Sequence, residues 1–220
     1  MSAAPLLEID DLVVDIRSMT ALRGFSMKIA RGAMVSLVGR NGAGKTTLMR
    51  SIMGHLKPVR GTVRFDGTDL SARPRHARAA LGIGYMPEDR CLVPQLTVEE
   101  NILLPLWVAK HLDRKARLDF VYYLIGELAE MRSRKALLLS GGQQKLVALG
   151  RALAVGTKCL LLDEPFEGIA PALSERLSEV LASLRGKDLT LLTAQSDMNH
   201  SRELIDAEFM IERGANLAAG

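Results

Sequence analysis

A glycine-rich stretch between an apolar run and a helix-like segment places the strongest constraint on the fold. It reads Gly-Arg-Asn-Gly-Ala-Gly-Lys-Thr and runs from Gly39 to Thr46. The glycines let main-chain N–H groups converge on phosphate without a Cβ in the way, and the following helix directs its positive end at the same point. Lys45 would neutralise phosphate charge, and the Thr46 hydroxyl would reach magnesium. The predicted phosphate-binding residues of this P-loop are Gly39, Arg40, Asn41, Gly42, Ala43, Gly44, Lys45, Thr46 and Thr47.

Apolar runs alternate with helix-like segments along the chain, which favours an α/β fold with a largely parallel sheet and helices on both faces. Thr97 and Glu100 have the spacing of a capping box at a helix start. The stretch from Pro94 to Ala154 is nearly all helix-like, which indicates an inserted helical subdomain. Expected strands are Leu6–Ile16 (one or two edge strands), Gly32–Val38, Gly61–Phe65, Ile83–Met86, Cys159–Leu162 and Leu189–Thr193; expected helices are Thr46–Met53, Leu118–Met131, one from about Gly142, and Ala172–Leu184.

The second motif is a pair of acidic residues that follows the apolar run Cys159–Leu162. A buried strand here would deliver Asp163 to its polar end, where the carboxylate can help to hold magnesium. Glu164 would orient the attacking water and remove its proton. An apolar strand that ends in two acids is weak evidence alone, but its combination with the P-loop predicts hydrolysis of a nucleoside triphosphate.

A third motif, Leu-Ser-Gly-Gly-Gln from Leu139 to Gln143, lies between the other two. Ser140, Gly141 and Gly142 would present free N–H groups, a hydroxyl and a helix dipole to an anion. A second phosphate-binding element is redundant in one chain unless it serves the nucleotide of another chain.

The three motifs, in this order, resemble those of the ABC (ATP-binding cassette) family over essentially the whole chain. The resemblance implies one ABC domain over residues 1–220, with a P-loop NTPase (RecA-like) core at about 1–93 and 155–220, antiparallel N-terminal strands, and a helical subdomain at about 94–154. It implies ATP and Mg²⁺ as ligands. It also implies that Ser140, Gly141, Gly142 and Gln143 close over ATP held by a partner ATPase.

Three loops are similar to those of the branched-chain amino-acid importer ATPases. Glu88 stands at the place of the usual glutamine of the Q-loop, where the resemblance implies a metal contact. Ala170 stands where most ABC proteins have aspartate, and Gln195 stands where most have a catalytic histidine. Gln195 can donate a hydrogen bond but cannot titrate near neutral pH. His200 is either a displaced switch histidine or an ordinary surface residue.

The sequence also departs from the family pattern. The aromatic residue that normally stacks on adenine should fall near position 16, where this chain has Ile16. Packing against the base would then be aliphatic. Phe166 and Glu167 are unusual in the loop that faces the partner, so pairing there is expected to be specialised.

Composition limits the location and the partners. There is no run of the roughly 18 to 20 apolar residues that a spanning helix needs, and no signal peptide is evident. The 29 Lys+Arg residues exceed the 25 Asp+Glu residues only slightly, and we expect no nucleic-acid partner. The densest basic group, Arg73, Arg75, His76 and Arg78, is either a solvated helix face or a lipid or phosphate contact.

We therefore expect a peripheral ATPase on the cytoplasmic face of the bacterial inner membrane. Its expected partners are integral-membrane permease subunits, a second ABC ATPase subunit, with a heterodimer favoured over a homodimer, and indirectly a periplasmic or extracellular solute-binding protein. An amino-acid importer leads. The alternatives are an exporter motor, a soluble ABC ATPase outside transport, and a degenerate cassette that only binds nucleotide.

Overall fold

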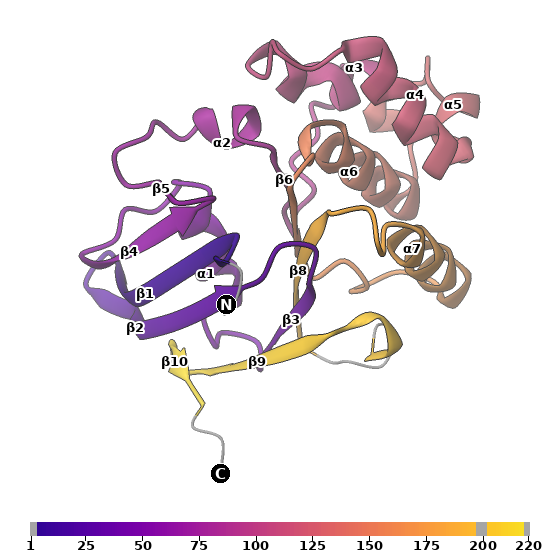
Figure 1. Ribbon diagram of the computed structural model, residues 1–220. Helices are drawn as coiled ribbons and strands as arrows, with labels where there is room; N and C mark the ends of the chain where they lie inside the picture. Colours follow the sequence, from indigo (N-terminus) through magenta and orange to yellow (C-terminus); the bar gives the residue numbers. More distant parts are fainter. Residues whose placement is uncertain (1–3, 197–201, 218–220) are drawn as a thin grey trace.

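The computed structural model describes residues 4–196 and 202–217, which fold around two sheets (Figure 1). The smaller sheet is antiparallel, with strand order β2-β1-β4-β5. Its first two strands form a hairpin in which Ile16 pairs with Met19, so only two residues make the turn. The strands are β1 (Leu7–Ile16), β2 (Met19–Ile29), β4 (Arg60–Phe65) and β5 (Thr68–Asp69).

The larger sheet has strand order β10-β9-β3-β8-β7-β6. Within the part of the chain that the structure describes, the strands from β9 to β6 run parallel, and β10 pairs antiparallel with β9. β7 and β8 are buried along their whole lengths, as expected for a parallel sheet covered on both faces. The strands are β3 (Met34–Val38), β6 (Ile83–Met86), β7 (Cys159–Asp163), β8 (Thr190–Gln195), β9 (Ala207–Glu212) and β10 (Ala215–Asn216).

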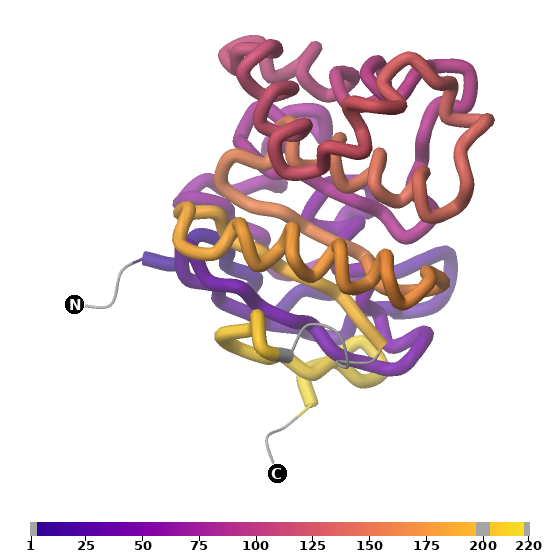
Figure 2. Tube along the Cα trace, turned by 90° about the vertical axis from the view of Figure 1, so that its right-hand side faces the viewer, coloured from indigo at the N-terminus to yellow at the C-terminus, as the bar shows by residue number. Residues whose placement is uncertain are grey.

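The helices fall into two groups. α1 (Lys45–Ile52) lies between the two sheets, whereas α7 (Pro171–Ser183) covers the opposite face of the larger sheet (Figures 1 and 2). The other long helix, α6 (Gly141–Val155), packs against β6 and carries the helical lobe. The remaining helical elements are α2 (Ala77–Ala80), α3 (Val98–Leu103), η1 (Leu104–Trp107), α4 (Arg114–Leu124), α5 (Gly126–Glu130), η2 (Ala136–Leu138) and η3 (Arg202–Leu204).

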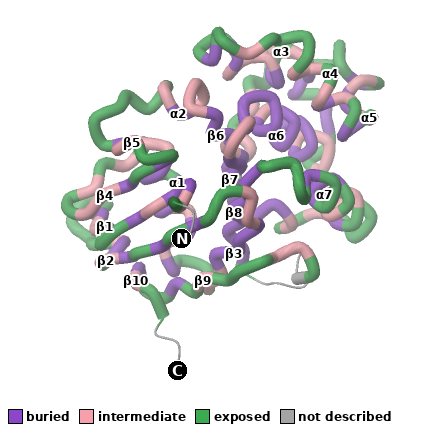
Figure 3. Tube along the Cα trace, viewed as in Figure 1, coloured by how far each residue is buried: buried purple, intermediate pink, exposed green. Residues whose placement is uncertain are grey.

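Two clusters of buried hydrophobic residues, as found among the described residues, hold these layers together; Figure 3 colours the buried positions along the trace purple. One fills the space between the sheets around α1, whose Leu48, Met49 and Ile52 are fully buried. The other joins the helical lobe to the larger sheet through α6, where Val147 and Leu153 have no exposed surface. Each cluster thus fixes one of the two motif-bearing helices to the sheet.

The predicted fold class is confirmed: an α/β core has a largely parallel sheet, and antiparallel strands lie near the N-terminus. The capping box is present, because the Thr97 N–H donates to Glu100 and the Glu100 N–H donates to the Thr97 hydroxyl. Among the described residues, four strands were not anticipated: β2, β5, β9 and β10. The helix expected over Leu118–Met131 is divided into α4 and α5 at Ile125, which has non-helical dihedrals.

The basic group near residue 75 is divided by burial. Arg78 is only 3% exposed, so it belongs to neither of the expected surface roles. Its guanidinium donates to the main-chain carbonyls of Ile52, Leu70, Arg73 and Pro74 at 2.7–3.2 Å. Arg78 therefore joins the end of α1 to the segment that follows β5.

Replacement of this buried guanidinium should destabilise the protein. We expect Arg78→Met to lower the free energy of unfolding by about 3 kcal/mol, because several carbonyls lose their donors without gaining water. Arg75→Met, at a neighbouring exposed arginine, is the matched control and should be near neutral. Urea denaturation of both variants measures the difference, and equal stabilities would contradict this role.

Candidate active site

The candidate site lies where four parallel strands end. β3, β8, β7 and β6 are neighbours in the larger sheet, so their carboxyl ends lie on one edge. This edge carries the P-loop after β3, Ser196 after β8, Glu164 after β7, and Glu88 just beyond β6. Ligands of open α/β sheets bind outside the carboxyl ends of the strands.

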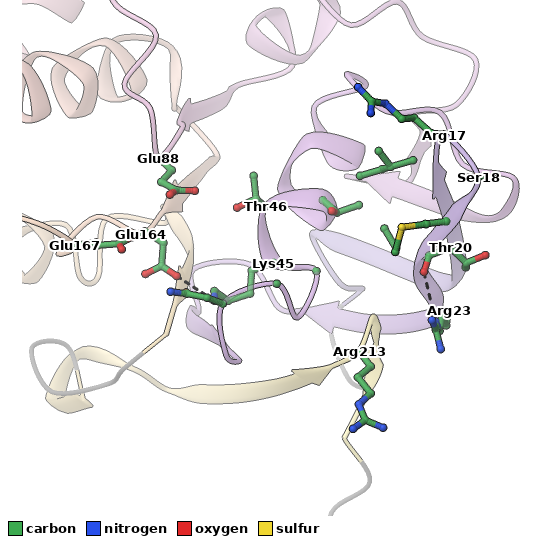
Figure 4. Close-up of a pocket in the computed structure, with 17 residues that line it drawn as sticks. Arg17, Ser18, Thr20, Arg23, Lys45, Thr46, Glu88, Glu164, Glu167 and Arg213 are labelled. Atoms are coloured by element: carbon green, nitrogen blue, oxygen red, sulfur yellow. Dashed lines mark hydrogen bonds and ion pairs between the residues drawn. The ribbon is translucent and has the colours of Figure 1, made fainter.

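A cavity of about 1150 Å³ opens at this edge (Figure 4). It extends from the acidic residues Glu88 and Glu164 to the β1–β2 hairpin, where Arg17 lies at the opposite end of the view. Its predicted site residues are Ile16, Asn41, Gly42, Gly44, Lys45, Thr46, Thr47, Glu88 and Glu164, and further lining residues are Arg17, Ser18, Met19, Thr20, Ala21, Arg23, Glu167 and Arg213.

The P-loop is held tightly by its surroundings. Lys45 is 5% exposed, and its ammonium donates to the carbonyls of Gly39 (2.6 Å) and Arg40 (3.3 Å). Gly39 has no space for a side chain, because a Cβ there would lie 2.4 Å from the Ile211 carbonyl oxygen. Gly44 has φ 113°, which favours glycine, immediately before α1 starts at Lys45. The loop therefore fixes the ammonium at the cavity and the start of α1 beside it.

Asp163 connects the two sequence motifs predicted to act together. It is fully buried, and its carboxylate accepts hydrogen bonds from Thr46 Oγ1 (3.2 Å) and Tyr85 Oη (3.4 Å). Burial, reinforced by the carboxylates of Glu88 and Glu164, raises the pKa of Asp163 to about 6, although both hydroxyl donors oppose the shift. Burial likewise raises the pKa of Tyr85, which keeps its hydroxyl protonated as a donor.

Several contacts hold Glu164 in the cavity. Its φ of 47° lies in the left-handed region, and its N–H donates to the Ala194 carbonyl at 2.9 Å. Its carboxylate accepts from the hydroxyl (2.7 Å) and the N–H (3.2 Å) of Ser196, and it lies 3.1 Å from the Lys45 ammonium. These contacts orient a carboxylate toward the cavity that the P-loop lines.

Ser196 was missed by sequence reasoning. Its hydroxyl is within hydrogen-bond distance of Asn41 Oδ1 (2.7 Å), Lys45 Nζ (3.0 Å) and Glu164 Oε1 (2.7 Å). Gln195, the residue predicted for this place, is 3% exposed, and its amide donates to the Ser36 and Thr193 hydroxyls within the sheet. The signal that could have identified Ser196 is strand alternation, since β8 extends to Gln195 rather than ending at Thr193. His200 lies outside the described residues.

The third motif does not line this cavity. Ser140 and Gly141 are exposed at the start of α6. The Ser140 hydroxyl accepts from the Gln143 N–H, and the Gln143 amide oxygen accepts from the Ser140 N–H, so the pair forms a capping box. The motif therefore presents a capped helix start on a different part of the surface.

The remaining predicted residues lie at opposite ends of the cavity. Glu88 faces the end where Thr46 and Glu164 lie (Figure 4). Ile16 is at the hairpin end, where its side chain is 42% exposed. Within residues 4–196 and 202–217, no group of three or more His, Cys, Asp or Glu side chains could hold a metal unaided. A hydroxyl beside a carboxylate nevertheless suits Mg²⁺, which commonly keeps water and phosphate ligands.

Comparison with known proteins establishes the family. The family model described as ABC transporter matches residues 22–167. This chain belongs to the ABC transporter family. The branched-chain amino acid transport ATP-binding protein BraG of Pseudomonas aeruginosa is 32% identical over 95% of this chain and 90% of its own length. The lipopolysaccharide export ATP-binding protein LptB of Haemophilus influenzae is 31% identical over 98% of this chain and 90% of its own length.

Solved structures agree with this assignment. A nucleotide-free ATP-binding cassette of an ABC transporter superposes with a TM-score of 0.82, at 28% identity, over 97% of this chain and 90% of that one. A dimeric bacterial ABC transporter cassette gives 0.86 at 25% identity, over 96% of both chains. This ABC protein is thus an ATP-binding and ATP-hydrolysing transporter subunit, of the kind that works with membrane permease subunits. No helix in the part of the chain that the structure describes is long and apolar enough to cross a membrane.

The buried Asp163 carboxyl should make the stability of this ABC ATPase depend on pH. Its folded-state pKa of about 6 lies above the ordinary value of 3.8, so the stability contributed by the protonated form is present at low pH and lost as pH rises through 6. Between pH 5 and pH 8, the free energy of unfolding of the wild type should fall by about 1 kcal/mol relative to that of Asp163→Asn. Denaturation in metal-free buffer measures this difference; parallel pH curves would contradict it.

Proposed function

We propose that this chain is the ATPase subunit of a bacterial ABC importer and powers uptake of a small solute, with branched-chain or related amino acids as the leading class. The similarity to BraG over nearly the full chain supports this proposal. The loop residues Glu88, Ala170 and Gln195 carry the choice of import over export, because they resemble the pattern of the branched-chain amino-acid importer ATPases. The subunit would act peripherally at the cytoplasmic face of the inner membrane, with permeases and, indirectly, an external solute-binding protein.

Export is the second candidate function. LptB proteins of several bacteria, named as lipopolysaccharide export ATPases, are 31–32% identical to this chain over 89–98% of its length. That is the same range as BraG. In either case the ATPase chemistry is the same, and the permeases would select the substrate and the direction.

The nucleotide would bind along the cavity with its phosphates on the P-loop. The N–H groups of residues 39–47 and the start of α1 would receive the phosphate oxygens, and Lys45 would neutralise their charge. Thr46, Asp163 and Glu88 would hold Mg²⁺ at the acidic end, where a divalent cation stabilises phosphoryl charge. The base would lie toward Ile16 and pack on an aliphatic surface instead of an aromatic ring.

Glu164 would act as the base that orients water and takes its proton during attack on the γ-phosphate. Its contacts with Ser196 and Lys45 fit this role, because they hold the carboxylate in one orientation in the cavity. Gln195 would act indirectly, because its amide donates hydrogen bonds to the Ser36 and Thr193 hydroxyls within the sheet.

The exposed start of α6 would serve the nucleotide of a partner ATPase. Ser140, Gly141, Gly142 and Gln143 lie apart from this chain's own cavity, and one of the similar solved structures is a dimeric cassette. A second ABC ATPase chain would therefore complete each site, and we favour a heterodimer over a homodimer. The helical subdomain of about 94–154, inserted in the core of about 1–93 and 155–220, would pass closure to the permeases.

Two substitutions should separate binding from hydrolysis. Glu164→Gln keeps the shape of the side chain but removes its basicity, so hydrolysis should fall at least about a hundredfold while MgATP binding persists. The ATP-bound dimer should then accumulate, alone or with a partner cassette.

Lys45→Ala should bind no MgATP, because the phosphates lose their main positive partner. Calorimetry and light scattering measure both results; unchanged MgATP affinity in Lys45→Ala would overturn the P-loop assignment.

Uptake by living cells tests the direction of transport. A strain that lacks this gene should lose uptake of labelled leucine, isoleucine or valine, and regain it with the wild-type gene but not with Glu164→Gln. Normal uptake of all three, combined with retention of lipopolysaccharide in the inner membrane, would overturn the importer proposal in favour of export. Loss of uptake of another small solute alone would replace the substrate class but keep the import direction.

A further inference from the structure

A buried lysine connects helix α6 to the loop that carries Glu164. Lys145 is the fifth residue of α6 and only 4% exposed. Its ammonium donates to the main-chain carbonyl oxygens of Glu164 (2.8 Å) and Glu167 (2.5 Å). One side chain thus bridges both ends of the four-residue stretch that follows β7.

This stretch has a main-chain conformation that needs support. Glu164 has φ 47° although it carries a side chain, which is a sparsely populated and unfavourable conformation. The Glu167 N–H donates to the Glu164 carbonyl at 3.3 Å, so the chain turns back on itself. The carbonyl that accepts from Glu167 is therefore the same one that accepts from Lys145, and the lysine fixes its direction.

The position of Lys145 separates it from the cavity proposed to bind this chain's own nucleotide. It does not line the large cavity; instead it lines a smaller one of about 220 Å³, together with Glu88, Arg90, Gly141 and Glu167. Burial, reinforced by the charge of Arg90, lowers the pKa of Lys145 to about 8, while the carboxylates of Glu167, Glu164 and Glu88 oppose that shift. Burial of this charge is unfavourable, and the two hydrogen bonds to main-chain carbonyls compensate for it.

We propose that Lys145 is a positioning residue that holds the Glu164 loop in its active conformation and ties it to the start of α6. This inference rests on the role proposed above for Glu164. Ser140 starts the same helix only five residues earlier, so the element offered to a partner's nucleotide and the base of this chain's own site are joined through one ammonium group. A shift of the start of α6 at the partner's nucleotide would then move Glu164, the base of this chain's own site.

Lys145→Met is the direct test, because methionine has similar length and no donor. Single-turnover hydrolysis of MgATP by the full chain should slow by roughly tenfold or more, since two charge-assisted hydrogen bonds are lost. MgATP affinity should change less than about twofold, because Lys145 lies outside the large cavity. Lys145→Gln, which keeps two donor hydrogens, should recover part of the rate and serves if Lys145→Met does not fold.

Arg117→Met is the matched control. The Arg117 guanidinium also donates to two main-chain carbonyls of α6, those of Leu153 and Ala154, near the other end of the helix. Arg117→Met should lower the melting temperature without slowing hydrolysis. An equal loss of hydrolysis in Arg117→Met and Lys145→Met would mean that any loosening of α6 is sufficient, which overturns the positioning role.

A double variant shows whether Lys145 acts through Glu164. Lys145→Met in a Glu164→Gln background should slow hydrolysis no further than Glu164→Gln alone. Additive losses, or wild-type hydrolysis by Lys145→Met, would overturn the inference and leave the proposed function intact. Wild-type hydrolysis by Glu164→Gln would instead overturn the role of Glu164 and, with it, the reason for positioning that loop.

Discussion

The spatial order β3, β8, β7, β6, with all four strands parallel, brings together residues from distant parts of the chain. Lys45, Glu88, Glu164 and Ser196 meet only because each follows the carboxyl end of one of these strands. Side-chain contacts then refine what the sheet arranges. The 3.2 Å contact between Thr46 and Asp163, for example, joins the first turn of α1 to the end of β7 across the intervening strand β8.

Several charged groups at and beside the site are carried by side chains that are almost fully buried. Lys45, Lys145, Asp163 and Glu164 are each 7% exposed or less. Buried ions destabilise a protein unless partners compensate them, and here the partners are main-chain carbonyls, hydroxyls and one ion pair. The same arrangement keeps donors and acceptors fixed before reaction, which is how active sites stabilise transition-state charge without reorganisation. Burial of these charges therefore lowers stability at the place where the proposed chemistry needs fixed dipoles.

Most of the fold could be predicted from the sequence, because apolar runs with defined ends mark buried parallel strands. β2 was missed because it has no continuous apolar run: only Phe25–Ile29 alternates between apolar and polar residues, as in a strand with one covered face, and Gly24 interrupts the pattern before it. Local motifs identified the P-loop and the two acids. Lys145 could not be recognised in this way, since its contacts join residues 19 and 22 positions apart through main-chain carbonyls, which have no sequence signature.

Strand alternation explains why Ser196 rather than Gln195 faces Glu164. Side chains two residues apart share one face of a strand, so Gln195 lies on the side of Thr193, to which its amide donates, and Ser196 falls on the opposite side. Neither serine nor glutamine titrates near neutral pH. Both can orient groups, but neither can exchange a proton with substrate as a histidine could. Among the described residues around Glu164, acid–base work in the proposed mechanism therefore falls on that carboxylate, which makes its positioning by Ser196 and Lys145 consequential.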